Sequence, residues 1–127
     1  MRKICLLVII AGLLMSAPVF AADTIKIGEI ATITGDFAAF GDAEVQAIKL
    51  AVKEINEKGG VLGKKLEVIM YDCRTRNEDM VNAARRLTKQ DKVTAVIGPS
   101  GSGLCIAAAS VFNDAKVPHI GTLPTNP

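Results

Sequence analysis

The stretch "VIGPSGSGLCIAAASVF", residues 96–112, runs from an apolar end through a Gly- and Ser-rich turn into a segment with few polar residues. This order predicts a buried strand, a tight turn and then a helix over residues 104–115. Ser102 falls where this helix begins, so we expect it to be the N-cap residue. The free N–H groups of the first turn and the helix dipole favour a carboxylate there. A capping loop without a ligand is the alternative.

The turn does not match the patterns that carry phosphate binding or catalysis. A P-loop needs a Lys after its second Gly, and "GPSGSG" (98–103) has none. A nucleophile elbow reads G-x-S-x-G, but Ser102 stands at the last Gly position. His119 is the only His and falls inside a short predicted strand, where a packed residue is expected. These patterns favour a binding turn and predict no enzyme.

Alternating strands and helices extend on both sides of this stretch. Apolar and β-branched runs predict strands at 24–33, 64–72, 93–98 and 117–122. Helical spacing predicts two further helices, at 42–58 and from Asn77 to Leu87, with residues 34–42 as a loop. Successive strand–helix units indicate an α/β fold, a parallel doubly wound sheet with helices on both faces. Because the sequence stops just past an inner strand, we expect an incomplete lobe.

The first 21 residues have the organisation of a secretory signal peptide. Arg2 and Lys3 precede an apolar run from Ile4 to Leu14, and Val19 and Ala21 occupy the −3 and −1 positions of a cleavage site. We expect cleavage after Ala21, export, and in a bacterium a periplasmic location. The alternative is an N-terminal membrane anchor, although the apolar run is short for a bilayer.

Charge and cysteine content exclude several partners. The formal charge is +2, and removing Arg2 and Lys3 leaves Lys+Arg at 13 against Asp+Glu at 13. Aromatic residues make up only 4% of the chain, so neither charge nor stacking indicates nucleic acid. Cys73 and Cys105 either form a disulfide or remain two buried thiols. They are not spaced for a metal site, and we expect no metal and no cofactor.

Three segments resemble one known family. They are "IKIGEIATITGDFAAFGDAEVQAIKLAVKEINEKGGVLGKKLEVIMYD" (25–72), "VTAVIGPSGSG" (93–103) and "AKVPHIGTLPTNP" (115–127). They resemble the leucine/isoleucine/valine-binding family of periplasmic solute-binding proteins, which feed ABC importers. The resemblance implies a two-lobed, hinge-closing receptor without catalysis, in which residues 22–127 are the N-terminal part of the first lobe.

The resemblance also implies the ligand-binding residues. Ser102 and neighbouring backbone amides, Gly103 among them, would bind the carboxylate of an amino acid. The Thr125 hydroxyl would meet the carboxylate and ammonium, and the backbone carbonyl of Leu123 would accept from the ammonium. Phe40 stands where the family often has Tyr and would line the pocket. Family members often carry a disulfide in this region, and Cys73 and Cys105 lie away from its usual positions.

The implied function is the solute-binding component of an ABC importer for branched-chain amino acids or a related small carboxylate or amide. Its partners would be that ligand and a membrane permease. A ligand-sensing module of a receptor with the same fold is the first alternative. An enzyme of hydrolase or flavodoxin-like type is the second, and it would need a nucleophile–base pair that these residues do not offer.

Overall fold

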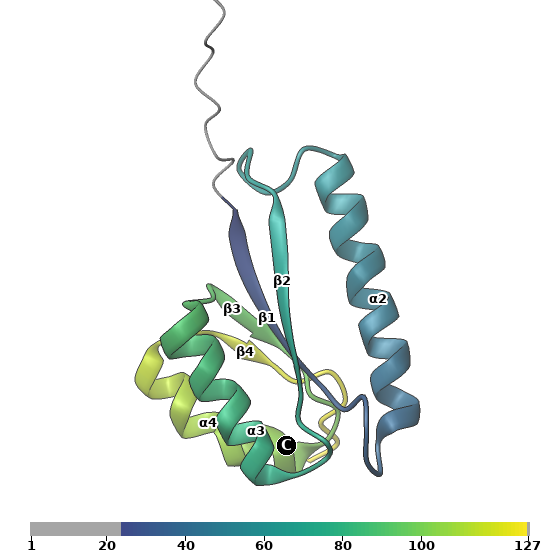
Figure 1. Cartoon of the computed structure of the whole chain (residues 1–127), viewed down its shortest axis with the longest axis vertical. Coiled ribbons are helices and arrows are strands. Elements are labelled where there is room, and N and C mark those ends of the chain that lie inside the picture. The colour runs from purple at the N-terminus through teal and green to yellow at the C-terminus, as the bar shows by residue number, and fades with distance from the viewer. Residues whose placement is uncertain (1–23, 127) are drawn as a thin grey trace, which may run out of the picture.

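A computed structural model describes residues 24–126, so the predicted signal peptide of residues 1–21 lies outside the described residues. The strands form one parallel sheet in the order β2–β1–β3–β4, as Figure 1 shows in part. They are β1 (Ile25–Ala31), β2 (Leu66–Asp72), β3 (Ala95–Ile97) and β4 (His119–Ile120). The structure confirms the predicted parallel α/β fold, with strands shorter than their apolar runs.

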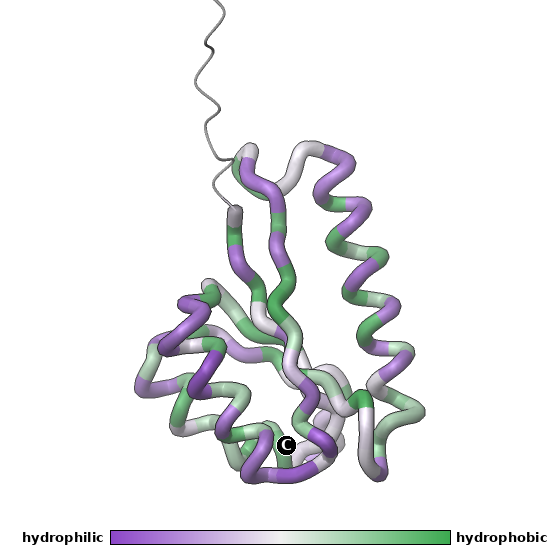
Figure 2. The backbone as a smooth tube through the Cα atoms, viewed as in Figure 1, coloured by the Kyte–Doolittle hydropathy of each residue, from purple (hydrophilic) through white to green (hydrophobic). Residues whose placement is uncertain are grey.

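Helices cover both faces of this sheet, as the sequence predicted. The helical segments are α2 (Ala38–Glu57), α3 (Asn77–Arg86), the π-helical turn η1 (Leu87–Asp91) and α4 (Ser102–Ala115). In Figure 1, α2 stands on one side of the sheet, while α3 and α4 lie side by side on the other. Figure 2 shows hydrophilic and hydrophobic residues alternating along α2 and α3, which is typical of helices with one buried face. No helix within residues 24–126 is long and apolar enough to cross a membrane.

The main core lies between the sheet and the α3–α4 pair. Successive residues of a strand point to opposite faces, so Gly28 and Ile30 of β1 share one face and Ile27 and Glu29 share the other. A Cβ on Gly28 would lie 2.8 Å from a methyl carbon of Leu87, which identifies the first face as the core side. The buried cluster on that side includes Ile30, Met80, Ala84, Leu87, Leu104, Ala108 and Phe112.

Helix α2 begins earlier than predicted. We expected residues 34–42 to form a loop, but the helix starts at Ala38 and therefore includes Phe40. The cause is a backbone contact: a Cβ on Gly41 would lie 2.2 Å from the carbonyl oxygen of Thr32. Only glycine lets the helix approach β1 so closely, and this contact fixes the first turn of α2 against the end of the strand.

The predicted helix caps are each displaced by one residue. The N-cap of α4 is Gly101, with φ +113°, and Ser102 is its first helical residue. The N-cap of α3 is Arg76, so Asn77 is likewise inside the helix. A side chain at Gly101 would meet the ring of Phe37 at 2.9 Å, and the positive φ also favours glycine there. The expectation that Ser102 caps α4 with its side chain was therefore wrong.

The face covered by α2 remains open beside β3 and β4. An apolar groove of about 270 Å³ lies there between α2 and the strands. Its lining includes Ile48, Val52 and Ile55 from α2, and Ile97 and Ile120 from β3 and β4. Ile120 is 69% exposed, so the groove is open beside β4, the edge strand of the described sheet.

Candidate functional site

The candidate site lies at the carboxyl edge of the sheet, where ligands bind in open parallel sheets. The loops after β1, β3 and β4 meet there at the first turn of α4. A cavity of about 330 Å³ opens between them and is lined by Phe37, Phe40, Ser100, Gly101, Leu123 and Thr125. The structure therefore brings together three of the predicted residues, Phe40, Leu123 and Thr125, from segments far apart in the sequence.

Ser102 joins the start of α4 to the loop after β4. Its Oγ accepts hydrogen bonds from the backbone N–H groups of Thr125 and Asn126, each at 3.0 Å. Both bonds use the oxygen's lone pairs, so the hydroxyl hydrogen remains available to donate. Gly103, the next residue, has open space at its Cα, and a Cβ there would contact nothing within 4 Å. Ser102 and Gly103 thus stand beside the cavity at the exposed helix start.

The N-terminus of α4 carries no compensating negative group. No side chain caps it, and its first turn contains no acidic residue. The first-turn N–H groups of a helix lack partners within the helix, and the dipole adds partial positive charge at this end. This end of α4 can therefore bind an anionic group such as a carboxylate.

Apolar side chains form the other wall of the cavity. The rings of Phe37 and Phe40 meet edge to face, with centroids 6.5 Å apart. Phe40 is 55% exposed and Leu123 is 51% exposed, so both offer free apolar surface. An apolar wall next to helix amides suits a small ligand with a carboxylate at one end and a hydrocarbon group at the other.

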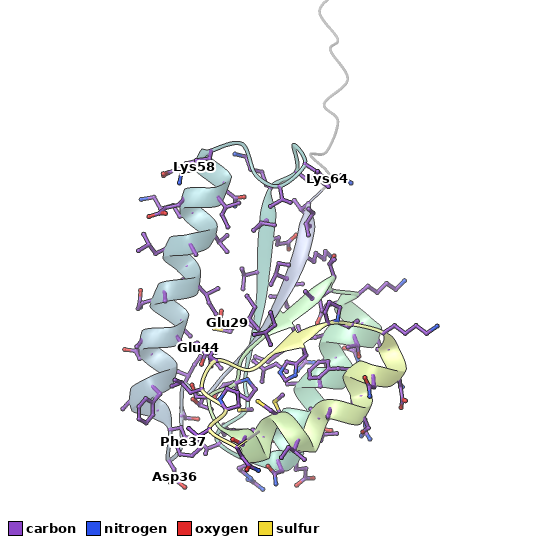
Figure 3. The ribbon with its side chains drawn as sticks, turned by 180° about the vertical axis from the view of Figure 1, so that it is seen from behind. Glu29, Asp36, Phe37, Glu44, Lys58 and Lys64 are labelled. Carbon is purple, nitrogen blue, oxygen red and sulfur yellow. The ribbon has the colours of Figure 1, made fainter. Side chains whose placement is uncertain are left out.

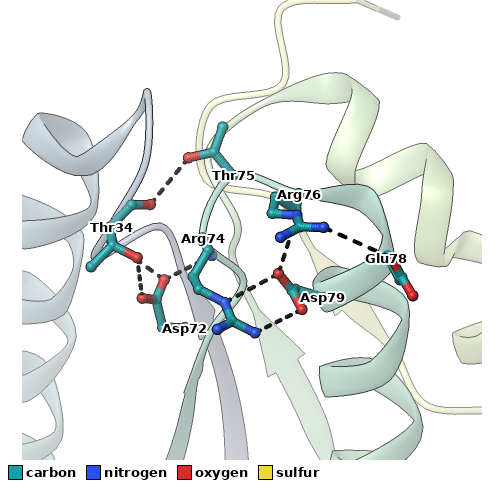
Figure 4. Close-up of polar contacts among 7 residues, drawn as sticks. All are labelled: Thr34, Asp72, Arg74, Thr75, Arg76, Glu78 and Asp79. Atoms are coloured by element: carbon teal, nitrogen blue, oxygen red, sulfur yellow. Dashed lines mark hydrogen bonds and ion pairs between the residues drawn. The ribbon is translucent and has the colours of Figure 1, made fainter.

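Asp72, at the end of β2, holds the first loop in place, as Figure 4 shows in part. Its carboxylate accepts hydrogen bonds from the hydroxyl of Thr34 at 2.6 Å and from the backbone N–H groups of Ile33 and Arg74 at 3.1 and 2.9 Å. Burial opposes ionisation of Asp72, but these hydrogen bonds outweigh it and hold the pKa below its usual value. The charged carboxylate therefore anchors the loop that leads to Phe37.

Thr75 extends this anchor to the aromatic wall. Its hydroxyl donates to the carbonyl of Thr34 at 3.2 Å and accepts from the N–H of Phe37 at 3.3 Å. The nearby arginine side chains bind acidic residues and do not line the cavity. Arg74 makes two hydrogen bonds to Asp79, at 2.9 and 3.1 Å (Figure 4). Residues 33–37 are thus fixed by polar contacts at the sheet edge.

Sequence reasoning missed a second polar cluster, which lies under the cavity. Glu44 of α2 accepts hydrogen bonds from Ser100 at 3.1 Å and from Thr122 at 2.9 Å. Figure 3 places Glu44 close to Glu29 of β1, which is only 1% exposed. The only sequence signal was the charge of Glu29 inside a mostly apolar run, which also contains Lys26.

The structure keeps both described cysteines as free thiols. Cys73 is buried beneath α3, and Cys105 lies on α4 with its Sγ 3.7 Å from the carbonyl oxygen of Pro99. The disulfide considered from the sequence is therefore not formed, because Cys73 packs in the main core while Cys105 faces Pro99 and Gly121. The alternative of two unpaired thiols is the one that the structure shows.

His119 is a packed strand residue. Its ring stacks on Phe112 with centroids 4.4 Å apart, and Nε2 lies 2.6 Å from the carbonyl oxygen of Gly98. Burial lowers its pKa, and the hydrogen bond with Gly98 offsets part of this effect. Among residues 24–126, no three His, Cys, Asp or Glu side chains gather in a way that could hold a metal ion.

Fold and site together define an α/β ligand-binding lobe with its cavity at the carboxyl ends of parallel strands. The chain belongs to the periplasmic binding protein family, whose profile matches residues 24–127. It is 35% identical over 119 residues to Leu/Ile/Val-binding protein homolog 7 of Brucella suis biovar 1, a match that covers 94% of the chain and 29% of that protein. The chain thus spans less than a third of the length of the curated relatives it matches.

Solved structures show the same relationship. The branched-chain amino acid transporter substrate-binding protein LivJ of Streptococcus pneumoniae, in complex with isoleucine, superposes with a TM-score of 0.80 at 39% identity, over 82% of this chain and 30% of that one. A solute-binding protein of an ABC transporter from Rhodopseudomonas palustris BisB5, in complex with 3,4-dihydroxybenzoic acid, gives a TM-score of 0.73 at 35% identity, over 80% of this chain and 27% of that one. The predicted family and fold are confirmed.

Proposed function

We propose that this chain is the N-terminal part of the first lobe of an extracytoplasmic solute-binding component of an ABC importer. Its ligand is a branched-chain amino acid or a related small carboxylate or amide. The observation that carries the proposal is the Ser102 hydroxyl, which stands at the uncapped start of α4 beside an apolar cavity.

The carboxylate end of the ligand binds at α4. The Ser102 hydroxyl and the backbone N–H groups around Gly103 donate to it, since both are free at this helix start. Thr125 and Leu123 lie on the loop that Ser102 holds. The Thr125 hydroxyl meets the carboxylate and the ammonium group of the ligand, and the Leu123 carbonyl accepts from the ammonium group. This assignment needs no charged side chain from the chain itself, because the helix end supplies the positive potential.

The apolar end of the ligand packs against Phe40 and Leu123. The ligands in the two related structures support this division of the site. Isoleucine and 3,4-dihydroxybenzoic acid differ in their apolar parts and only isoleucine carries an ammonium group, but both have a carboxylate. A carboxylate-binding helix end is therefore the feature that the two related proteins can share with this chain.

Residues 22–127 supply only part of the binding protein. The match covers only 29% of the Brucella suis protein and 30% of the LivJ structure, which supports a second lobe beyond this chain. The apolar groove along α2, with Ile120 69% exposed at its edge, supports a first lobe completed by further chain. A ligand held between two lobes would lose most of its contact with water, as small-molecule sites usually require.

The remaining elements of the proposal concern export and partners. Cleavage after Ala21 releases a mature chain that starts at Ala22 outside the cytoplasm, and a membrane permease receives the ligand. The related proteins reported above carry the names of binding proteins, and the function proposed for this chain is ligand binding, in which no covalent bond is broken. N-terminal sequencing of the exported protein tests the cleavage site: a start at Ala22 is expected, and an intact Met1 would contradict export by cleavage.

Calorimetric titration of the whole native protein tests the ligand class. We expect L-leucine, L-isoleucine or L-valine to bind, and isobutylamine, which lacks the carboxylate, to bind at least about a hundredfold more weakly, because a charged hydrogen-bond partner is lost. If none of these amino acids binds, 3,4-dihydroxybenzoic acid tests the wider carboxylate class. Binding of isobutylamine as tight as that of the amino acids would overturn the assignment of α4.

A further inference from the structure

The polar cluster beneath the cavity links three elements that the ligand site depends on. Glu44 projects from α2, and its two carboxylate oxygens take separate partners: Oε2 accepts from the hydroxyl of Ser100 and Oε1 from that of Thr122. The two hydroxyls also lie 3.3 Å from each other. One carboxylate therefore joins α2 to the loop after β3 and to the loop after β4.

Both loops carry residues of the candidate site. Ser100 and Gly101 line the cavity directly and lead into the start of α4. Thr122 precedes Leu123 and Thr125, and its own N–H donates to the carbonyl of Pro99 at 3.3 Å. Because Ser100 is only 3% exposed, its bond to Glu44 is shielded from water and costly to leave unmade.

The packing beside the Glu44 carboxylate leaves no room for a side chain at position 98. A Cβ on Gly98 would lie 2.6 Å from Glu44 Oε1 and 2.4 Å from the carbonyl oxygen of Ile30. Gly98 also has φ +83°, a conformation that favours glycine. The loop after β3 thus passes closely between β1 and the Glu44 carboxylate.

A second carboxyl group lies on the same side of the sheet. Glu29 is 1% exposed, and its Oε1 has no hydrogen-bond partner among residues 24–126. The strands beside it present the uncharged Met70 and Ile97 in register. The charged groups that act on Glu29 come from α2, where Glu44 disfavours its ionisation and Lys49 favours it.

We propose that Glu44 is a positioning residue of the ligand site, which clamps Ser100 and Thr122 so that the loops after β3 and β4 stand together, and that Glu29 supports this clamp by remaining protonated beneath it. The proposal rests on the proposed function where it concerns ligand affinity, whereas the clamp itself is a property of the fold. Two ionised carboxylates on this face of the sheet would repel each other, so a protonated Glu29 leaves the single charge on Glu44 for the two hydroxyls.

The titration of both groups agrees with this geometry. Burial, followed by the charge of Glu44, raises the pKa of Glu29 from 4.5 to about 7. Burial also raises the pKa of Glu44, while its hydrogen bonds from Thr122 and Ser100 lower it in part. Burial raises the pKa of the Cys73 and Cys105 thiols, the first buried and the second partly buried, and the charge of Glu44 raises both pKa values further. Glu29 is therefore mainly protonated below about pH 7.

The test measures the affinity of the whole native protein for L-isoleucine between about pH 5.5 and about pH 8.5, a range in which the amino acid stays zwitterionic. The variants are Glu29→Gln, Glu44→Gln and Thr122→Val, with Glu57→Gln as the matched control on the exposed end of α2. We expect wild type and control to lose affinity as the pH rises through about 7, since Glu29 then becomes charged.

Each variant has a distinct expected result. Glu29→Gln should bind as wild type does at low pH and should lose the dependence on pH. Glu44→Gln should bind more weakly by about fivefold at low pH, a size usual for residues that act through others. Thr122→Val keeps both charges, so it should weaken binding and retain the pH dependence. A Glu29→Gln profile equal to that of wild type, or unchanged affinity in both Glu44→Gln and Thr122→Val, would overturn the proposal.

A second measurement separates the clamp from the proposed function. If wild type does not bind L-isoleucine, amide hydrogen exchange is compared in Glu44→Gln and Glu57→Gln at one pH. Faster exchange at residues 99–103 and 121–126 in Glu44→Gln, with unchanged exchange in β1, would support the clamp and reject only the ligand. Equal exchange in the two variants would reject the clamp itself.

Discussion

The hydroxyl oxygen of Ser102 lies 3.0 Å from the backbone nitrogen of Thr125, a contact that spans 23 residues and joins the start of α4 to the loop after β4. The same oxygen also accepts from Asn126, so one side chain organises the amides of this loop. The contact places a hydroxyl donor, helix amides and an apolar cavity at one edge of the sheet.

Replacing Ser102 with Ala should weaken the binding of L-isoleucine by about 1–3 kcal/mol, because a buried charged group then loses a hydrogen-bond partner. The expected loss includes the freed N–H groups of Thr125 and Asn126. Calorimetric titration of the whole native protein measures it, with Ser110→Ala, on an exposed position of α4, as the control. Equal affinity in the two variants would mean that Ser102 serves only to hold the loop.

Replacing Phe40 with Ala should reduce discrimination between large and small side chains. The ring is 55% exposed and lines the cavity, so the loss should be about 1–2 kcal/mol for L-leucine and much smaller for L-alanine. Competition binding with the two amino acids measures the difference. Phe40→Tyr keeps the ring and should keep the discrimination. Equal losses of affinity for both ligands would mean that the ligand's side chain does not contact Phe40.

Two helical glycines should respond in opposite ways to replacement by Ala. Gly41→Ala puts a Cβ 2.2 Å from the carbonyl oxygen of Thr32, so it should lower the free energy of unfolding by about 1–3 kcal/mol through overpacking. Gly103→Ala meets nothing within 4 Å and should be neutral or slightly stabilising. Chemical denaturation compares them. Because Gly103→Ala retains its backbone N–H, its ligand affinity should also stay near that of wild type.

Glu29 should make the stability of the protein depend on pH. The folded state raises the pKa of this carboxyl from 4.5 to about 7, so between these values the folded state holds a proton that the unfolded state has lost. The contribution of Glu29 to stability is therefore present below about pH 4.5 and declines as the pH rises to about 7. Glu29→Gln should match wild type near pH 4.5 and be more stable by about 3 kcal/mol at pH 8.

Thermal unfolding at these two pH values measures the effect on Glu29→Gln, and Glu57→Gln serves as the exposed control. Glu57 differs from Glu29 in burial, since its side chain is 64% exposed, and it forms only a surface ion pair with Lys53 at 3.8 Å. A Glu29→Gln protein that is no more stable than wild type at pH 8 would argue that Glu29 is ionised there without cost.

The strands and helices could be predicted from the sequence because they depend on the local periodicity of apolar residues. The stripe of Met80 and Ala83 marks α3 and continues into η1 at Leu87, and these residues are buried as their spacing indicates. The start of α2 could not be predicted, since it depends on the close approach of Gly41 to Thr32, a tertiary contact with no local signal.

The candidate site likewise has one part that local sequence signals predict and another that depends on tertiary contacts. Ser102 could be placed at the helix start because a polar turn precedes an apolar helix, although the cap itself is Gly101. The Glu44 clamp could not be predicted, since its partners Ser100 and Thr122 lie 56 and 78 residues away. Family resemblance pointed to Phe40, Leu123 and Thr125, and the structure brings them to one cavity.

The crystal structure of the whole native protein with L-isoleucine tests the central claim most directly. We expect the ligand's carboxylate to accept hydrogen bonds from the Ser102 hydroxyl and from backbone N–H groups in the first turn of α4, with its hydrocarbon side chain against Phe40. A ligand whose carboxylate is bound elsewhere, with the first turn of α4 facing only water, would contradict the account.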